Sequence, residues 1–250
     1  MLSNADQQNS YLLHTRNYRE SSHIVDLFSR DFGRLRAVAR GGRGKKKLGG
    51  HQLQAFTPLF LSWRGKGDLK NLTGVESSGR SSALHGEMLY IGLYLNELLL
   101  RLLPEYVPHE SLFDSYGELI VQLSNGTDPE PLLRRFELLL LDELGYGLDM
   151  TTESVEGRPI IAGEHYHLSP DQGFMRIDAW TGNNKEVCFA GEHLLAIAEN
   201  DYRSSDVRRC AKLLSRSALQ AQLGGRPLLS RQLFRQVRAP GSVAQGAKGG

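Results

Sequence analysis

The fold of this chain is decided by one stretch, SHIVDLFSRDFGRLRAVA, which spans residues 22–39. Apolar and polar residues alternate on both sides of its centre, as expected for strands that are buried on one face. Asp31–Gly33 supplies turn-forming residues between the two halves. The stretch therefore predicts two strands, over Ser22–Ser29 and Arg34–Ala39, joined by a turn.

Three more strands are predicted around this pair. One is Ser10–Arg16, and the other two are Phe56–Trp63 and Asp68–Val75, which are joined by a glycine turn at 65–67. A glycine-rich basic segment at 41–50 interrupts the pattern after the third strand. Five short strands with this spacing are typical of a small closed barrel of the OB type, and an SH3-like barrel would have a similar count.

From residue 81 the pattern becomes helical. Ser82–Leu103 is apolar on nearly every side, which predicts a helix buried in the middle of a bundle. Pro129 in a first turn and Gly145 just past the end are the expected boundaries of another helix. Further helices are predicted over His109–Leu123, Glu192–Asn200, Ser205–Leu223 and Ser230–Val237, with short strands or an irregular insertion at 148–187.

The predicted fold class is α+β, with an N-terminal five-stranded OB-type β-barrel followed by a mainly α-helical C-terminal domain. We expect the barrel domain at 1–80 and the helical domain at 81–238. Residues 239–250 are small and polar, and we expect them to form a disordered tail.

Formal charge is segregated along the chain. Residues 1–80 carry 14 Lys and Arg against 6 Asp and Glu, residues 81–200 carry 6 against 20, and residues 201–250 carry 10 against 2. The net charge of +2 therefore conceals a basic head, an acidic middle and a basic tail. Such segregation predicts a partner of defined charge, and nucleic acid is the polyanion that fits the basic ends.

The densest cationic stretch is RLRAVARGGRGKKK, residues 34–47. The period of two puts Arg34 and Arg36 on one strand face, and the glycines let backbone amides approach phosphates closely. Phosphate contacts carry no base information, so we expect sequence-independent binding; the alternative is a solvated basic surface with no ligand. The predicted DNA-binding residues are Arg16, Arg19, Arg34, Arg36, Arg40, Arg43, Lys45, Lys46 and Lys47.

Aromatic residues of the barrel could stack on unpaired bases. Small barrels are filled by their own side chains, however, so most of these aromatics are expected in the core. Tyr18, close to Arg16 and Arg19 near a strand end, is the best stacking candidate. The candidates for stacking are Tyr11, Tyr18, Phe28, Phe56, Phe60 and Trp63.

Several other classes of protein are disfavoured. The two cysteines, Cys188 and Cys210, fit free thiols in a reducing cytoplasm, and there is no secretory signal and no membrane-spanning apolar run. No H-x-x-x-H, G-x-S-x-G or phosphate-loop motif marks a catalytic centre, so we expect a non-enzymatic protein. A histidine metal site at His165 and His167, or a metal-dependent nuclease, is a minor alternative.

Five short motifs then occur in order: LHTRNYRESS (13–22), FGR (32–34), ARG (39–41), LGYG (144–147) and GGRPLLSR (224–231). Together they resemble the RecO family of bacterial DNA repair proteins, over the chain to about residue 238. The resemblance implies an OB domain followed by a helical domain. It also implies a cytoplasmic, nucleoid-associated recombination mediator that binds single- and double-stranded DNA and anneals complementary strands. An RNA-binding OB module is the alternative.

The resemblance further implies protein partners: the C-terminal tail of single-stranded-DNA-binding protein, and RecR, with which the family loads RecA. Cations within the acidic domain, beside a leucine-rich stripe, would suit that acidic, apolar-ended tail. The alternative is pairing of these cations with the domain's own carboxylates, Glu130, Glu137 and Asp142. The predicted tail-binding residues are Arg134, Arg135, Phe136, Arg203, Arg208 and Arg209, with Lys212 and Arg216 nearby.

The chain departs from the family pattern at two places. Many relatives carry a four-cysteine zinc site, but residues 148–187 hold no cysteine, so we expect neither zinc nor any other cofactor. Leu229 stands where relatives often have lysine, so the predicted C-terminal anion site rests on Arg226 and Arg231.

Overall fold

The computed structural model describes residues 4–40, 53–79, 82–169, 172–177 and 187–238. The chain divides into two units. The first unit combines residues 1–125 with residues 226–250, and the second is the continuous stretch 126–225. The predicted C-terminal tail lies outside the described residues.

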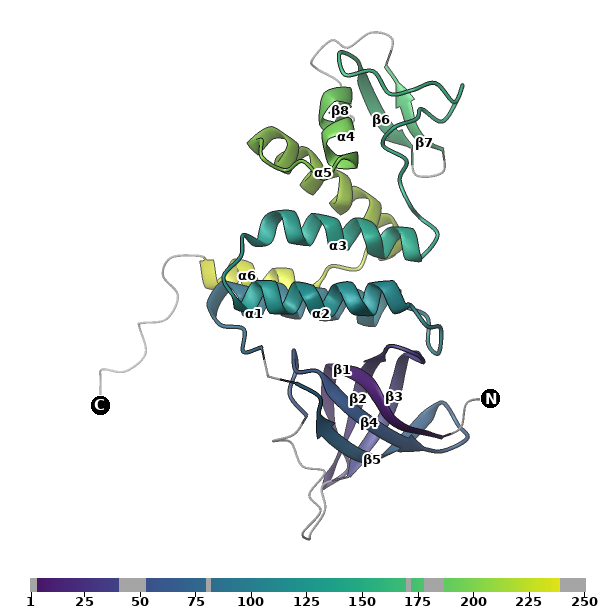
Figure 1. The fold of residues 1–250 in the computed structure, drawn as a ribbon, viewed down its shortest axis with the longest axis vertical. Helices are drawn as coiled ribbons and strands as arrows, with labels where there is room; N and C mark the ends of the chain where they lie inside the picture. Colours follow the sequence, from purple (N-terminus) through teal and green to yellow (C-terminus); the bar gives the residue numbers. More distant parts are fainter. Residues whose placement is uncertain (1–3, 41–52, 80–81, 170–171, 178–186, 239–250) are drawn as a thin grey trace, which may run out of the picture. The chain divides into compact units, whose positions relative to one another are not determined.

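The first unit contains a closed five-stranded barrel in the order β1-β2-β3-β5-β4 (Figure 1). All neighbouring strands are antiparallel except β3 and β5, which are parallel. This is the arrangement of an OB barrel, so the predicted fold class is confirmed. The strands are β1 (Ala5–Tyr18), β2 (Ser22–Ser29), β3 (Gly33–Arg40), β4 (Leu59–Arg64) and β5 (Leu69–Ser77).

Alternate residues of the hairpin formed by β2 and β3 fill the barrel. Val25 and Leu27 of β2 and Leu35 and Ala37 of β3 are fully buried, and they pack with Trp63 of β4. The residues between them point to the outer face, as the period of two requires. Arg34 and Arg36 therefore share the outer face, as predicted.

Two strands begin three or more residues away from their predicted starts. β1 begins at Ala5 because this polar segment pairs with β4, where Ala5 lies opposite Trp63. β4 begins at Leu59 because Phe56 has a positive φ of 64° and lies outside the strand, and Pro58 has no N–H to give to a ladder.

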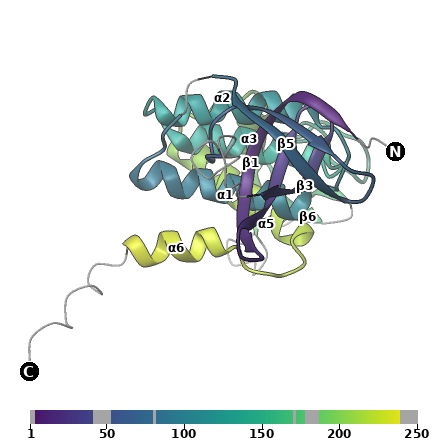
Figure 2. The ribbon, with the colours of Figure 1, turned by 90° about the horizontal axis from the view of Figure 1, so that it is seen from below.

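In its described residues the first unit also contains the helices α1 (Gly86–Leu102), α2 (Glu110–Ser124) and α6 (Leu229–Arg238). α1 packs against β1, α2 and α6, and Figure 2 shows α6 (yellow) along its full length. The buried side chain of Asn96 in α1 donates to the Leu13 carbonyl of β1 at 3.0 Å and accepts from the Tyr116 hydroxyl of α2 at 2.7 Å. Burial raises the pKa of Tyr116 well above its ordinary value, so this hydroxyl stays a donor.

The second unit joins three helices to a three-stranded sheet of order β7-β6-β8. Its core includes Tyr166, Phe174, Phe189, Leu194 and Leu214, all of them buried. The Asp128 side chain caps α3 by accepting from the Glu130 N–H at 3.1 Å. The elements are α3 (Pro129–Glu143), β6 (His165–Ser169), β7 (Gly173–Arg176), β8 (Cys188–Ala190), α4 (Gly191–Ala198) and α5 (Ser205–Gln222).

Candidate nucleic-acid interface and peptide pocket

Strands β1, β2 and β3 share one outer barrel face, whose central residues are buried; Asp26 is 6% exposed. Because side chains alternate, every second residue of these strands lies on it, and the strand register aligns those residues in rows. Ile24 and Val38 in the middle row are both 9% exposed. The three rows are His14–Asp26–Arg36, Arg16–Ile24–Val38 and Tyr18–Ser22–Arg40.

One end of the outer barrel face carries exposed arginines. Arg16 is in β1, Arg19 is in the β1–β2 turn and Arg40 is the last residue of β3. Arg40 donates to the Asn71 side chain at 3.3 Å, and the Arg19 guanidinium lies 5.1 Å from the centre of the Tyr18 ring. Among the described residues, none of these three arginines forms an ion pair with a carboxylate. Their charge is therefore available to an external anion.

The two arginines toward the other end share one carboxylate of the chain, Glu105. Arg34 donates through Nε to the Leu103 carbonyl at 2.9 Å and pairs with Glu105 at 3.2 Å. The Arg36 Nε lies 3.0 Å from the same Glu105 carboxylate. The backbone carbonyl of Arg34 also accepts from the Tyr106 N–H at 2.9 Å. These contacts give Arg34 a structural role, because it ties β3 to the segment between α1 and α2.

Arg43, Lys45, Lys46 and Lys47 lie outside the described residues. Arg40 ends β3 immediately before this basic segment, so the segment begins at the end of the barrel that carries the exposed arginines.

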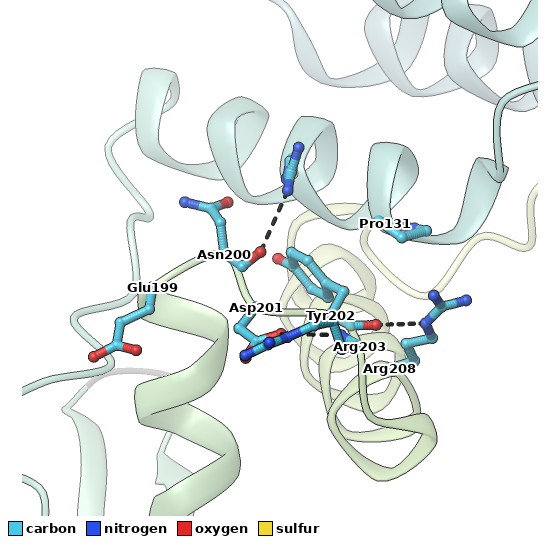
Figure 3. A pocket seen from close by; sticks show the side chains of 8 residues that line it. Pro131, Glu199, Asn200, Asp201, Tyr202, Arg203 and Arg208 are labelled. Atoms are coloured by element: carbon cyan, nitrogen blue, oxygen red, sulfur yellow. Dashed lines mark hydrogen bonds and ion pairs between the residues drawn. The ribbon is translucent and has the colours of Figure 1, made fainter.

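The second unit contains an open pocket of about 510 Å³. Pro131 and Arg135 line it from α3, Arg208 lines it from α5, and the connection between α4 and α5 supplies the rest. Figure 3 shows these side chains, with the Arg203 guanidinium turned toward Asp201. The complete lining is Pro131, Arg135, Glu199, Asn200, Asp201, Tyr202, Arg203 and Arg208.

Hydrogen bonds fix the arginines of the pocket. Arg135 donates to the Asn200 carbonyl at 3.3 Å, and its guanidinium lies 5.7 Å from the centre of the Tyr202 ring. Arg208 donates through Nε to the Tyr202 carbonyl at 2.6 Å and pairs with Asp128 at 2.6 Å. The pocket therefore combines guanidinium groups in defined positions with Pro131 and with Tyr202, which is 4% exposed.

Arg203 is held by its neighbour Asp201. Its Nε and Nη2 donate to the two oxygens of that carboxylate, at 2.9 and 2.6 Å. These bonds, together with one from the Arg203 N–H, lower the pKa of Asp201 to about 2. Both partners are thus charged at neutral pH, and an acidic ligand of Arg203 would compete with Asp201.

Other members of the predicted tail set lie away from the pocket. Arg134 is 5% exposed, pairs with Glu137 at 2.8 Å and donates to the Ser215 hydroxyl at 2.8 Å. This is the intramolecular pairing that the sequence left as an alternative. Phe136 is buried, and Arg209 is exposed and pairs with Asp206. Only Arg135, Arg203 and Arg208 of the predicted set line the pocket.

The predicted C-terminal anion site contains a carboxylate of the chain. Glu97 of α1 accepts from the backbone N–H groups of Leu229 and Ser230, both at 2.9 Å, at the start of α6. Burial by itself would raise the pKa of Glu97, but these hydrogen bonds and the charge of Arg101 hold it below its ordinary value. Arg231 donates to the Tyr94 hydroxyl at 3.0 Å, and Arg226 is exposed.

The described residues do not fit the zinc site of the wider family. No group of three or more His, Cys, Asp and Glu side chains within the described ranges could hold a metal ion. The interior of the small sheet is instead apolar, with Tyr166, Phe174 and Phe189. Burial raises the pKa of the Cys210 thiol to about 12, so this cysteine is not a ready thiolate ligand. In the same ranges, no helix is both long and apolar enough to cross a membrane.

The sequence interpretation missed the segment Glu199–Tyr202, which forms one wall of the pocket. Its signal is the pair Asn200-Asp201 directly after a helix. Asparagine tolerates the left-handed conformation, and Asn200 has a φ of 59°, which turns its carbonyl toward Arg135.

Comparison with known proteins gives a consistent result over nearly the whole chain. Residues 4–79 match the family model "Recombination protein O N terminal", and residues 84–232 match "Recombination protein O C terminal". The chain is 44% identical to the DNA repair protein RecO of Cellvibrio japonicus, covering 95% of this chain and 98% of that protein. It is 44% identical to the RecO of Pseudomonas putida (92% and 97% covered) and 42% identical to that of Photobacterium profundum (91% and 94%).

Proposed function

The chain belongs to the recombination protein O family of DNA repair proteins, and on that premise we propose that it is a recombination mediator. In this proposal it binds single- and double-stranded DNA without sequence specificity and anneals complementary strands. It docks on the C-terminal tail of single-stranded-DNA-binding protein and acts with RecR to load RecA.

The observation that carries the DNA-binding part is the position of the exposed arginines. Arg16, Arg19 and Arg40 lie at the end of the outer barrel face where the basic segment begins. OB barrels bind oligonucleotides on the face of the second and third strands and on the β1–β2 loop. Arg40 ends β3 and Arg19 lies in the β1–β2 turn, and Arg16 precedes that turn in β1. Guanidinium groups without carboxylate partners suit phosphates and carry no preference for base sequence.

Annealing follows from the same surface. A cationic face neutralises phosphate charge on a bound strand and so lowers the repulsion between two complementary strands. Base pairing then supplies the free energy. The chain needs no catalytic group for this reaction.

The pocket of the second unit supports docking of the tail. An acidic peptide that ends in an apolar residue needs cations and an apolar wall. Arg135 and Arg208 supply fixed guanidinium groups, and Pro131 and Tyr202 supply the wall. Arg134 is buried and has no part in this proposal, although the sequence analysis predicted it as a tail-binding residue.

Two sets of substitutions test whether DNA and tail binding use separate surfaces. Arg16→Ala with Arg40→Ala should weaken binding of labelled single-stranded DNA and slow annealing, and should leave calorimetric binding of the tail peptide unchanged. Arg135→Ala with Arg208→Ala should weaken binding of the tail peptide and should leave DNA binding and annealing unchanged. RecA should load more slowly, in the presence of RecR, onto DNA coated with single-stranded-DNA-binding protein when either pair of arginines is replaced.

Matched controls remove one exposed arginine from each unit at other places. Arg64→Ala removes a barrel arginine that is paired with Asp6, and Arg158→Ala removes an arginine paired with Glu156. If Arg64→Ala weakens DNA binding as much as the first pair does, the DNA site is not at the proposed end. A wild-type protein that prefers RNA to DNA of equal sequence would replace the proposal with the RNA-binding alternative.

A further inference from the structure

A tyrosine and an arginine form a stack at the β1–β2 turn. Tyr18 is the last residue of β1, and the guanidinium of Arg19 lies 5.1 Å from the centre of its ring. Arg19 has a φ of 56°, in the left-handed region that favours glycine. A long cationic side chain therefore occupies a strained turn position, and such strain is characteristic of functional sites.

The strand register places this stack beside two more arginines. Tyr18 lies opposite Ser22, and Ser22 lies opposite Arg40 of β3. Arg16 precedes Tyr18 by two residues on the same face of β1, so it points to the same side of the barrel. Because serine is small, Ser22 places only a short side chain between the Tyr18 ring and Arg40.

The other aromatic candidates of the barrel are less suited to a nucleic-acid ligand, and Phe32 in the β2–β3 turn packs against the Trp63 ring. Tyr11, Phe28, Phe56 and Trp63 are between 0% and 8% exposed. Phe60 is partly exposed, but it lies opposite Glu76 in the β4–β5 ladder, where a phosphate would be repelled. Tyr18 thus combines a partly exposed ring with neighbouring cations.

We infer that Tyr18 and Arg19 form a stacking site for one unpaired base of a nucleic-acid strand, and that Arg16 and Arg40 hold the adjacent phosphates. This inference rests on the proposed DNA-binding function and assigns it a specific contact. A base can stack on the tyrosine ring, and the guanidinium can lie over either π system.

The site distinguishes single strands from duplexes. Within a duplex both faces of a base are covered by neighbouring bases, so the ring of Tyr18 has no base to contact. Phosphates remain accessible in both forms, so the arginines bind either one. Pairing of the held strand removes the stacked base from Tyr18, and the annealed product is therefore held less tightly than the single strand.

The test compares Tyr18→Leu, which removes the ring, with Tyr18→Phe, which keeps it. Anisotropy measures their affinity for a short oligothymidylate and for a blunt duplex of the same length. Loss of one stacked base weakens binding by roughly 5- to 150-fold. We expect Tyr18→Leu to show this loss on the single strand only, with an unchanged salt slope, and Tyr18→Phe to bind like the wild type. Arg16→Ala, the matched control, should weaken both DNAs and lower the salt slope by about one.

A second arm changes the DNA, and its first comparison uses the wild-type protein alone. An abasic strand of equal length should bind the wild-type protein more weakly than oligothymidylate does, and Tyr18→Leu should bind the two strands equally. Equal losses of Tyr18→Leu on strand and duplex, or no wild-type preference for bases over abasic positions, would overturn the stacking site. A wild-type protein that binds neither DNA would instead refute the proposed function.

Discussion

Glu97 accepts two hydrogen bonds from Ser230, one from its backbone N–H at 2.9 Å and one from its hydroxyl at 2.6 Å. The carboxylate thus occupies the N-terminus of α6, where backbone N–H groups and the helix dipole favour negative charge. A motif that predicted an external anion site has an internal carboxylate at its centre.

Replacing Glu97 with glutamine should destabilise the first unit by about 1–2 kcal/mol at neutral pH, because charge-assisted hydrogen bonds are lost. The pKa of Glu97 is lower in the folded state, so its stabilisation is present above the unfolded pKa of about 4.3 and disappears as the pH falls through the folded value. Urea unfolding between pH 7 and pH 3 measures this. The stability difference between wild type and Glu97→Gln should shrink with acidity. Exposed Glu118→Gln on α2 is the control, and an equal effect of Glu118→Gln would count against the capping role.

Arg34 and Arg40 share a strand face but should differ in function. Arg34→Met breaks contacts with Leu103 and Glu105 and should cost about 1–3 kcal/mol of stability, with little change in the salt dependence of DNA binding. Arg40→Met should leave stability nearly unchanged and reduce the slope of log affinity against log salt by about one. Thermal unfolding and anisotropy at several salt concentrations separate the two. A reduced slope in Arg34→Met would return Arg34 to the DNA-binding set.

Asp201 should weaken tail binding by competing for Arg203. Asp201→Asn keeps a side-chain oxygen for the Arg203 N–H but removes the charge, so tail-peptide affinity should rise roughly two- to fivefold, the range for an exposed ion pair. Because the pKa of Asp201 is about 2, the gain should be constant between pH 5 and pH 8. Asp206→Asn removes an equal charge, paired with Arg209 away from the pocket. A gain of the same size in this control would indicate a general charge effect.

The purified protein should contain no stoichiometric zinc, and a chelator should leave its Tm unchanged. Cys188 and Cys210 cannot supply two paired thiolate ligands, and the sheet interior in the second unit is apolar. Elemental analysis and thermal unfolding with and without chelator measure both. One tightly bound equivalent of zinc would revive the site at His165 and His167.

Local pattern predicted most elements of the fold, because burial on one face leaves a period in the sequence. The alternation over residues 22–39 placed β2 and β3 and set the shared face of Arg34 and Arg36. The pattern could not predict their partner Glu105, about 70 residues away. Nor could it predict β8, three residues long, which lies between the predicted insertion at 148–187 and the predicted helix from Glu192.

The sequence indicated which types of residue would form the candidate sites, but it did not indicate which groups each residue contacts. Arg135, Arg203 and Arg208 line one pocket, although they come from α3, from the connection after α4 and from α5. Arg134 is adjacent to Arg135 but pairs with Glu137 inside the core. Which of two adjacent arginines faces a pocket depends on where the neighbouring helix lies, and a single sequence does not contain that.

Helix α6 belongs to the first unit although it is the last described helix of the chain. A ribosome therefore makes Glu97 133 residues before its partner Ser230. The barrel, α1 and α2 are synthesised first, and the side of α1 that contacts α6 stays uncovered until the entire second unit has been synthesised. A nonsense mutation or proteolytic cleavage that removes α6 therefore removes a packing partner of α1 and destabilises the N-terminal unit.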